Sequence, residues 1–480
     1  MEVNEQEQVQ QTGGRPSRVV WVVLAVVLAA ALAALGAAFA VWYFNGQHAP
    51  VAAPSENTSF TAVNDSGVSA NTNTYTNTAA ESNAKSTTGR FSQKLDGALE
   101  QTDEHGVVYG TTPAGINYAV RGRGEAAAQA DKVTLAACGD QIVSANALGI
   151  AARNFAETGN GDGYDFSFWY QETTPFVSKY DLRFINPETV TCNTAERAPT
   201  GWPAFISPDS AVDNLAAQGY NVFNFASNHI YDYGVDAIIR THEQEFSKYP
   251  GITVVGSYLS EESAETVHMI ERNGINFAFL AYTFADNTYF QDYTAMPNYY
   301  LNRPFDYDTI NADVARAKQV ADVVIVGMHW GTEYVSEPNS QQYEWAEYLA
   351  DMGVDLVLGT HAHIMQPVQY ITGPASGHVV PVVFGLSDFV SGWTITDTIL
   401  SGIFTCDFVP QADGTVAVKN PAWNPTIEWS DGSTSPYVRL LANMSADEIN
   451  ANTRTPDVSD DFAYLYDMIH NLITEIPIAW

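Results

Sequence analysis

Short apolar runs alternate with amphipathic helical patterns from residue 132 onward. The apolar runs, rich in β-branched and aromatic residues, are 133–138, 182–185, 221–226, 252–255, 275–282, 322–328, 354–358, 379–386 and 402–409. Apolar residues recur at helical spacing between several of these runs, over 209–218, 234–248, 308–320 and 340–352. This alternation is typical of layered α/β domains, and runs that are apolar throughout indicate strands covered on both faces. We therefore predict an α/β domain over residues 131–410.

The pattern weakens on both sides of this domain. After it, we expect strands around 415–420 and 426–430 and a final helix over 460–476. We interpret residues 411–480 as a C-terminal extension that packs on the domain. Before it, residues 45–130 are predicted to be a flexible stalk followed by a transitional segment. The first part of this segment is rich in Asn, Thr and Ser and has few large apolar side chains to bury.

One long apolar stretch, residues 19–44, carries no charge and is long enough to cross a bilayer as a helix. Arg15 and Arg18 precede it, and this bias in positive charge predicts that residues 1–18 are cytoplasmic and that everything after the span is extracellular. A cleaved signal peptide is the alternative, because Ala38-Phe39-Ala40 has the pattern of a cleavage site. Both interpretations put the α/β domain outside the cell membrane.

Acidic residues outnumber basic ones by 55 to 21, which gives a formal net charge of −34. Because such a surface repels phosphate backbones, the composition argues against nucleic-acid binding. The three cysteines are far apart in the sequence and form neither a disulfide framework nor a cysteine-based zinc motif.

Polar residues able to bind metals directly follow five of the predicted strands. They are Asp140, Glu188, Asn228, His229, His329, His361 and His363. Ligands in open α/β sheets bind beyond the carboxyl ends of the strands, so we expect these side chains to lie close together. Each alone has an ordinary explanation, since single histidines at strand ends are more often structural and Gly-Asp is a common turn. Their conjunction is much harder to explain as a series of turns.

Imidazole, carboxylate and amide groups together are ligands for Zn, Mn or Fe ions. Spread over five strand ends, they are too many for one tetrahedral ion, but they suit two divalent ions that share a bridging carboxylate. Pairs of metal ions recur in enzymes that hydrolyse phosphoesters and related bonds. The sequence therefore predicts a site for two divalent metal ions.

Three segments resemble the signature segments of the CapA family of bacterial capsule and poly-γ-glutamate synthesis proteins. They are NFASNHIYDYG (224–234), VGMHWGTEY (326–334) and VLGTHAHIMQPVQY (357–370), and the shorter CGDQ and INPET match the first two motifs of the family. This family is similar to calcineurin-like metallophosphoesterases. The resemblance therefore implies a metallophosphatase-like layered sandwich of mixed β-sheets flanked by helices, with a dinuclear metal site. One departure is Ser387-Asp388, which stands where we expect Gly-Asn.

The resemblance also implies roles for individual residues. Asp140, Glu188 and His363 would hold one metal, and Glu188, Asn228, His329 and His361 the other, with Glu188 bridging. Ile142 stands where the usual Asp-X-His motif has a further histidine, so the first site is weaker or completed by water, and a mononuclear site is the alternative. A metal-bound hydroxide would be the nucleophile, and His229 would protonate the leaving oxygen or stabilise the transition state.

Five further residues have both a functional and a structural interpretation. Asp232 either orients His229 or caps the helix that begins near residue 234. Glu333 either bonds a ligand histidine, contacts substrate, or is a solvated loop carboxylate. Trp330, Tyr334 and Tyr282 either line a substrate pocket or pack near the strand ends.

Three functions are consistent with this pattern. The first is a membrane-anchored, metal-dependent hydrolase of a phosphoester or of the amide links of an anionic polymer. The second is a non-catalytic partner of poly-γ-glutamate synthase subunits that binds polymer or takes part in its export. The third, a solute-binding domain on a stalk, predicts no bound transition metal.

Overall fold

The computed structural model describes residues 92–283, 303–304, 306–454 and 462–480. The predicted cytoplasmic segment, the predicted membrane span and most of the predicted stalk, residues 1–91, lie outside this part of the chain. Within the described ranges, no helix is both long enough and apolar enough to span a bilayer.

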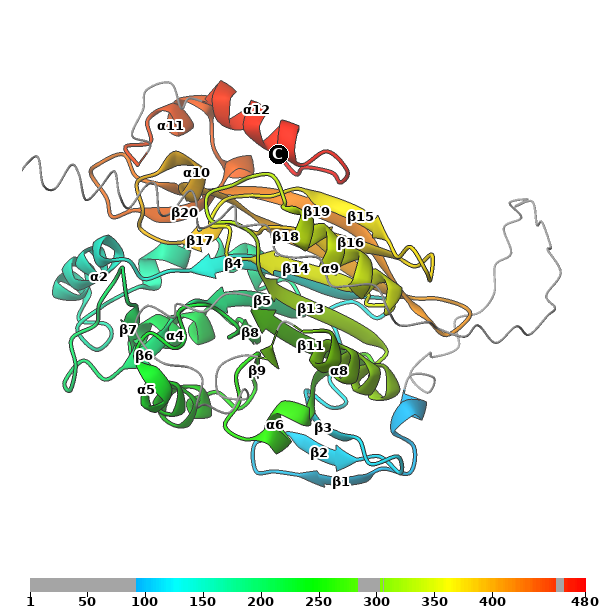
Figure 1. Ribbon diagram of the computed structural model, residues 1–480. Coiled ribbons are helices and arrows are strands. Elements are labelled where there is room, and N and C mark those ends of the chain that lie inside the picture. The colour runs from blue at the N-terminus through cyan, green and yellow to red at the C-terminus, as the bar shows by residue number, and fades with distance from the viewer. Residues whose placement is uncertain (1–91, 284–302, 305, 455–461) are drawn as a thin grey trace, which may run out of the picture. The chain divides into compact units, whose positions relative to one another are not determined.

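Ten strands of the described residues form the first sheet, which is mixed (Figure 1). Its order is β1 (Leu99–Thr102), β2 (Val108–Thr111), β3 (Asn117–Arg121), β10 (Val267–Arg272), β11 (Ile275–Thr283), β13 (Val323–His329), β14 (Leu356–Thr360), β16 (Val379–Val383) and β15 (Val368–Thr372), with β12 (Arg303–Pro304) beside β11. The inner strands β11, β13, β14 and β16 run parallel, so the carboxyl ends of β13 and β14 meet at one edge.

Eight strands of the described residues form the second sheet. Its order is β20 (Tyr437–Leu440), β19 (Val416–Trp429), β18 (Leu400–Pro410), β4 (Val133–Gln141), β5 (Leu182–Pro187), β8 (Val222–Asn224) and β9 (Thr253–Val255), with β17 (Asp388–Val390) beside β4. Strands β4, β5, β8 and β9 are parallel, and β18, β19 and β20 extend the sheet in antiparallel fashion. A small separate pair joins β6 (Val190–Cys192) and β7 (Ile206–Pro208).

The two sheets pack face to face around a common apolar core. Leu135 of β4 and Phe277 of β11 point into this core, together with side chains from β5, β13, β14, β18 and β19. The alternate residues of the same strands point outward, so Ala136 of β4 and Ala278 of β11 belong to two other clusters. Because side chains alternate along a strand, each central strand is buried on both faces.

Helices cover the outer face of each sheet. On the second sheet they include α2 (Ala145–Thr158), α4 (Asp209–Ala217) and α5 (Gly234–Arg240), and on the first sheet they include α8 (Tyr307–Val320) and α9 (Ser340–Asp351). The shorter helices are α3 (Thr174–Val177), α6 (Glu261–Glu265), α10 (Thr396–Ile399) and α11 (Ala446–Asn450), and α12 (Phe462–Leu472) is the final one. The result is a mixed, layered α/β fold, as the sequence predicts.

The segments on either side of the predicted domain take part in the sheets. Strands β1 to β3 extend the first sheet, because β3 pairs in parallel with β10. Strand β19 pairs with β18 along most of its length, and Trp423 and Ile427 of β19 enter the shared core. The described part of 45–130 therefore includes ordered strands, and residues 416–440 continue a sheet where we predicted an added extension. The pairing of β3 with β10 joins segments that are far apart in the sequence, whereas β18 and β19 are consecutive strands joined by a short turn.

Candidate functional site

The carboxyl ends of the parallel strands in both sheets meet at one place. The backbone N–H of His361, after β14, donates to Oδ2 of Asp140 in β4 at 3.1 Å. Nε2 of His329, at the end of β13, lies 2.9 Å from Oδ1 of Asn228, which follows β8. Nδ1 of His363 lies 3.4 Å from Oδ2 of Asp140. Side chains separated by more than two hundred residues are therefore brought together.

The side chains form two overlapping groups that have the composition of metal sites. Asp140, Glu188 and His363 form one group, and Glu188, His329 and His361 form the other, with the ligand atoms of each within 4.8 Å of one another. Glu188 belongs to both groups, as expected for a bridging carboxylate. Together with Asn228, these are the six residues that the sequence predicted as ligands.

The site contains buried carboxylate oxygens without protein partners. Within the described residues, neither oxygen of Glu188 accepts a hydrogen bond, although Nε2 of His329 lies 3.4 Å from its Oε1. Glu188 is 1% exposed. A buried carboxylate is stable in its charged form only when cations or hydrogen-bond donors compensate it. The residues present therefore fit one or more bound divalent cations.

Burial shifts the pKa values of this cluster. Burial, and then the charge of Asp140, raise the pKa of Glu188 well above its usual range. Burial and the neighbouring histidines lower the pKa of both His329 and His361, so each ring is neutral near pH 7. Burial alone would lower the pKa of His363, but nearby carboxylates raise it well above its usual value. Neutral imidazoles beside carboxylates are the form that binds a metal ion.

Three residues that the sequence analysis did not select hold these ligands in place. Nδ2 of Asn186 donates to Oδ1 of Asp140 at 2.8 Å, and the Thr360 hydroxyl lies 2.9 Å from Nδ1 of His329. Oδ1 of Asp388 lies 3.0 Å from Nδ1 of His363, and burial raises the pKa of Asp388 to about 7. Contacts of this kind orient metal ligands. Thr360 directly precedes His361 and Asn186 lies two residues before Glu188, both within the quoted motifs, and this proximity in sequence was the available signal.

His229 and Asp232 form a dyad beside the predicted ligands. Nδ1 of His229 lies 2.7 Å from Oδ2 of Asp232, which also accepts a hydrogen bond from the backbone N–H of Phe205. The residue at the N-cap of α5 is Tyr233, and its side chain makes no capping hydrogen bond. Of the two interpretations of Asp232, the structure supports the contact with His229.

The backbone at the site is strained and closely packed. His361 and His363 have φ values of 87° and 60°, in the left-handed region that costs a non-glycine residue about 1–2 kcal/mol. Such strain is common where side chains are held for function. Gly139 and Gly359 are required for close approach, since a Cβ on either would lie about 2 Å from the carbonyl oxygen of Ser387 or Phe384.

Two of the predicted pocket residues are packing residues instead. Trp330 is 1% exposed, and its indole N–H donates to the carbonyl oxygen of Phe384 at 2.8 Å. Tyr282 is fully buried in the core beneath α8 and α9. Of the two interpretations of Trp330, its burial favours packing, because the indole is enclosed by the fold and its one donor is already satisfied.

Glu333 and Tyr334 lie at the exposed side of the site. Glu333 forms a third group with His361 and His363, again with ligand atoms within 4.8 Å of one another. Tyr334 is 50% exposed, and its ring centroid is 5.6 Å from that of His363. Its backbone N–H donates to the Ala362 carbonyl, which ties the two loops together. Both side chains therefore have access to a molecule that enters the site.

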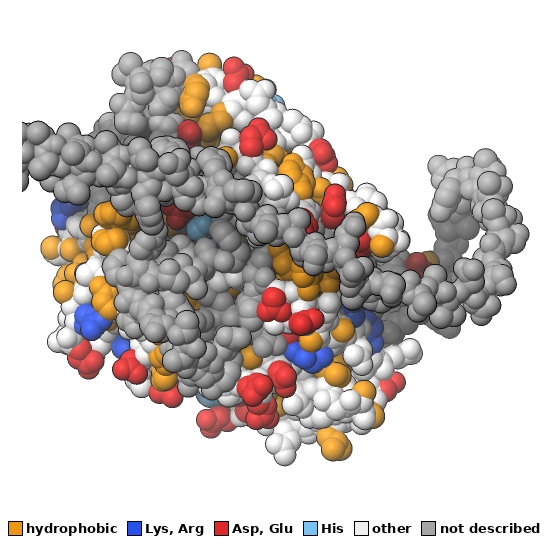
Figure 2. All heavy atoms as spheres, viewed as in Figure 1, with side chains coloured by type: hydrophobic (Ala, Val, Ile, Leu, Met, Phe, Trp, Pro, Cys, Tyr) orange, Lys and Arg blue, Asp and Glu red, His pale blue; other side chains and the backbone are white. Residues whose placement is uncertain are grey.

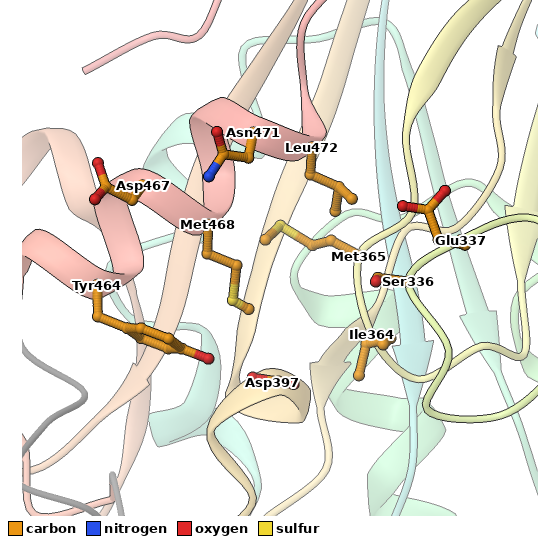
Figure 3. Close-up of a pocket in the computed structure, with 10 residues that line it drawn as sticks. All are labelled: Ser336, Glu337, Ile364, Met365, Asp397, Tyr464, Asp467, Met468, Asn471 and Leu472. Atoms are coloured by element: carbon orange, nitrogen blue, oxygen red, sulfur yellow. The ribbon is translucent and has the colours of Figure 1, made fainter.

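A cavity of about 490 Å³ is lined by residues that directly follow His363 in the sequence (Figure 3). Ile364 and Met365, which follow that histidine, form one wall, and Met468 and other residues of α12 form the opposite wall. Its lining includes the carboxylates of Glu337, Asp397 and Asp467, and none of the described residues that line it is a lysine or arginine. Acidic side chains are also spread over the face shown in Figure 2, with few basic ones among them.

Comparison with known proteins gives related sequences. The family model described as "Bacterial capsule synthesis protein PGA_cap" matches residues 134–393. The PGA biosynthesis protein CapA of Bacillus subtilis (strain 168) is 29% identical over 263 residues, which cover 54% of this chain and 66% of that protein. The capsule biosynthesis protein CapA of Bacillus anthracis is 24% identical over 276 residues, which cover 55% of this chain and 62% of that protein. The match thus spans slightly less than two thirds of the length of either relative.

Two further matches are more distant. A protein of Mycobacterium tuberculosis (strain CDC 1551 / Oshkosh), described as a "Probable polyglutamine synthesis accessory protein", is 26% identical over 224 residues, covering 44% of this chain and 56% of that protein. The structure of NAD nucleotidase from Haemophilus influenzae aligns with a TM-score of 0.36 and 11% identity over 72% of this chain and 64% of that chain. A TM-score this low fixes neither fold nor function. The family model, however, covers more than half of the 480 residues and includes every predicted ligand, and the protein belongs to the bacterial capsule synthesis family PGA_cap.

Proposed function

We propose that this protein is a metal-dependent hydrolase of the capsule or poly-γ-glutamate system, acting on a phosphoester or on amide links of an anionic polymer. One observation carries the proposal: two groups of metal-binding side chains share Glu188, and a buried His–Asp pair lies beside them. Paired sites of this kind, with an adjacent proton donor, are a common arrangement for hydrolysis. The layered α/β fold, with the site beyond its strand ends, agrees with a metallophosphatase-like enzyme.

Two divalent ions of Mn, Fe or Zn are the proposed cofactors. The residues that would hold them are Asp140, Glu188 and His363 for one and Glu188, Asn228, His329 and His361 for the other. When bound, such ions supply Lewis-acid activation of the scissile bond and lower the pKa of water.

The His229–Asp232 pair is proposed to transfer the proton. Because Nδ1 of His229 is 2.7 Å from the Asp232 carboxylate, that contact fixes the orientation and tautomer of the ring. The hydrogen on Nδ1 points at Asp232, so in the protonated ring Nε2 is the atom that gives its proton to the leaving oxygen or nitrogen of the substrate, and the ring returns to its neutral form. The Phe205 ring packs edge-on against the imidazole at 4.6 Å and limits its rotation.

The setting of the enzyme is part of the proposal. We infer a single-pass membrane protein in which residues 19–44 anchor the chain, residues 1–18 are cytoplasmic, and the α/β domain is extracellular. Polyglutamate synthase subunits are the proposed partners, in line with one relative named as a PGA biosynthesis protein and another named as a polyglutamine synthesis accessory protein.

The test is hydrolysis of a generic phosphodiester, a phosphomonoester and poly-γ-glutamate by the purified full chain with added Mn²⁺. The expected result is turnover that requires the metal and that falls in His229→Ala, with metal content unchanged by elemental analysis. Trp330→Phe is the matched control, because it changes a buried aromatic near the site and should leave turnover largely intact. Full metal occupancy with no turnover of any of these substrates would refute the hydrolase.

The second candidate is a non-catalytic partner that binds polymer for a synthase. The names of the relatives favour it, since they describe biosynthesis and accessory proteins. It predicts bound metal and polymer binding without turnover in the same assay. A solute-binding domain predicts protein free of transition metal, so the elemental analysis separates it from both.

A further inference from the structure

A second cavity, of about 430 Å³, contains none of the predicted metal ligands. It lies among β2, β3, β9 and β10 and the turns that follow α5, which are η3 (Thr241–Glu245) and η4 (Phe246–Lys248). Its volume is in the usual range for small-molecule sites. Unlike the acidic cavity beside His363, it is lined by Arg121 and by three histidines, His105, His242 and His268.

Strand register places two of these residues on one face of the first sheet. His268 of β10 is paired with Ala119 of β3, and Arg121 lies two residues further along β3. Tyr109 of β2, which also lines the cavity, is paired with the same Ala119. Because residues two apart in a strand point to the same side, Arg121, His268 and Tyr109 share the floor of the cavity.

Arg121 lines this cavity, and its guanidinium has one donor without a hydrogen-bond partner among the described residues. Its Nε donates to the carbonyl oxygen of Pro250 at 2.9 Å, but Nη1 is buried and has no hydrogen-bond partner among the described residues. Asp103 also lines the cavity, but its Oδ1 already accepts the backbone N–H groups of His105 and Val107. A buried guanidinium N–H without an acceptor is costly, so Arg121 is suited to an added anionic oxygen.

His268 provides the complementary group. Its Nε2 lies 3.0 Å from the carbonyl oxygen of Ser263, so Nε2 carries the hydrogen, and Nδ1 has a lone pair. Nδ1 is buried and lacks a partner within the described residues. Burial and the nearby charge of Arg121 lower the pKa of His268 to about 4, and burial lowers that of His242 to about 4. Near pH 7, the cavity therefore presents a buried cation beside a neutral nitrogen that needs a donor.

We propose that this cavity binds one unit of a γ-linked glutamate polymer, with its free carboxylate on Arg121 and its amide N–H on Nδ1 of His268. In such a unit, the carboxylate and the N–H are attached to the same carbon atom, so both reach neighbouring partners together. This inference rests on the proposed polymer substrate but not on catalysis. It also provides a cationic contact for an anionic chain on a protein whose net charge is −34.

The test is calorimetric titration of the full chain with a short γ-linked glutamate oligomer in EDTA, so that binding at the metal site is removed. Arg121→Gln should weaken binding about tenfold or more, the effect of losing one charge-assisted hydrogen bond. Ser247→Trp, at the exposed rim of the cavity, should weaken it by filling the space. Arg123→Gln is the matched control, because Arg123 is already ion-paired with Glu100 and Glu271 and does not line the cavity.

Two measurements guard against misfolded variants. In the wild-type protein, the oligomer should shift the ring nitrogen signals of His268 in NMR spectra, and an oligomer with esterified carboxylates should not bind. The proposal is overturned if the oligomer fails to bind in EDTA, if Arg121→Gln binds as tightly as the wild type, or if inorganic phosphate binds as tightly as the oligomer. If the oligomer binds as expected but the protein shows no Mn²⁺-dependent turnover, the proposed hydrolase is refuted and the proposed binding site is not.

Discussion

Replacing Glu188 with Gln should make the metal-free protein more stable and abolish its stabilisation by metal. Glu188 is buried, its two carboxylate oxygens accept no hydrogen bond from the described residues, and the charge of Asp140 opposes its ionisation. In the absence of cations, the ionised carboxylate therefore destabilises the folded protein. Glutamine has nearly the same shape and no charge, so the substitution removes the buried charge without opening a cavity.

The size of the effect follows from the burial. An unsatisfied buried acceptor costs about 1–3 kcal/mol, and more when it is charged. Because glutamine keeps a buried polar amide in the same place, the substitution removes only the extra cost of the charge, and we expect Glu188→Gln to raise the free energy of unfolding in EDTA by about 1 kcal/mol near pH 7. With Mn²⁺ at about 100 times its dissociation constant, the wild type should gain about 2.7 kcal/mol from binding, whereas the variant should gain little.

The assay is urea denaturation of both proteins, in EDTA and in Mn²⁺. Glu428→Gln is the matched control, because Glu428 is equally buried but accepts hydrogen bonds from the backbone N–H groups of Ser391 and Gly392 and lies 3.3 Å from Arg454. The same substitution there should destabilise the protein in both conditions. A loss of stability in Glu188→Gln without metal, or an undiminished gain with Mn²⁺, would show that Glu188 is not an uncompensated metal ligand.

Three further predictions address the proposed catalytic dyad, the packing of the site and the buried histidines. Asp232→Asn should lower kcat by about 10²-fold or more, because the ring of His229 loses its carboxylate partner, while metal content stays unchanged; an unaltered kcat would remove the dyad from the mechanism. Gly139→Ala should reduce metal affinity, since its Cβ would lie 1.9 Å from the Ser387 carbonyl oxygen and displace β17 from β4; calorimetric titration with Mn²⁺ at wild-type affinity would contradict this. His242 and His268 have pKa values of about 4 in the folded protein, below the 6.5 expected in the unfolded chain. Between pH 6.5 and pH 4 the unfolded chain therefore binds more protons than the folded protein. The stability that the two neutral histidines contribute is lost as the pH falls through this range. For each histidine, the free energy of unfolding changes by at most about 1.4 kcal/mol per pH unit. A variant with Gln at both positions should therefore lose less stability than the wild type between pH 7 and pH 5 in urea denaturation. Equal losses in the two proteins would contradict the lowered pKa values.

The sequence determined most of the strands and the identity of the candidate ligands. A buried strand needs a short apolar run, and a surface helix needs apolar residues at helical spacing, so both are visible locally in the chain. Each of the six candidate ligands lies at the carboxyl end of a predicted strand or just beyond it. The general rule that sites form at strand ends was therefore enough to expect that they meet.

The tertiary structure decided which residues support that site and which only pack. Asp388 lies next to Asp140 because β17 pairs with β4, a contact across more than two hundred residues that no local pattern records. The same holds for Arg121 and His268, which share a face only through the pairing of β3 with β10. Trp330 follows a predicted ligand in sequence, yet its side chain points into the core, since neighbouring residues in an extended chain face opposite ways. Local periodicity determines where helices and strands form. The burial of a side chain and the residues that it contacts depend on distant segments of the chain, which come together only when the protein folds.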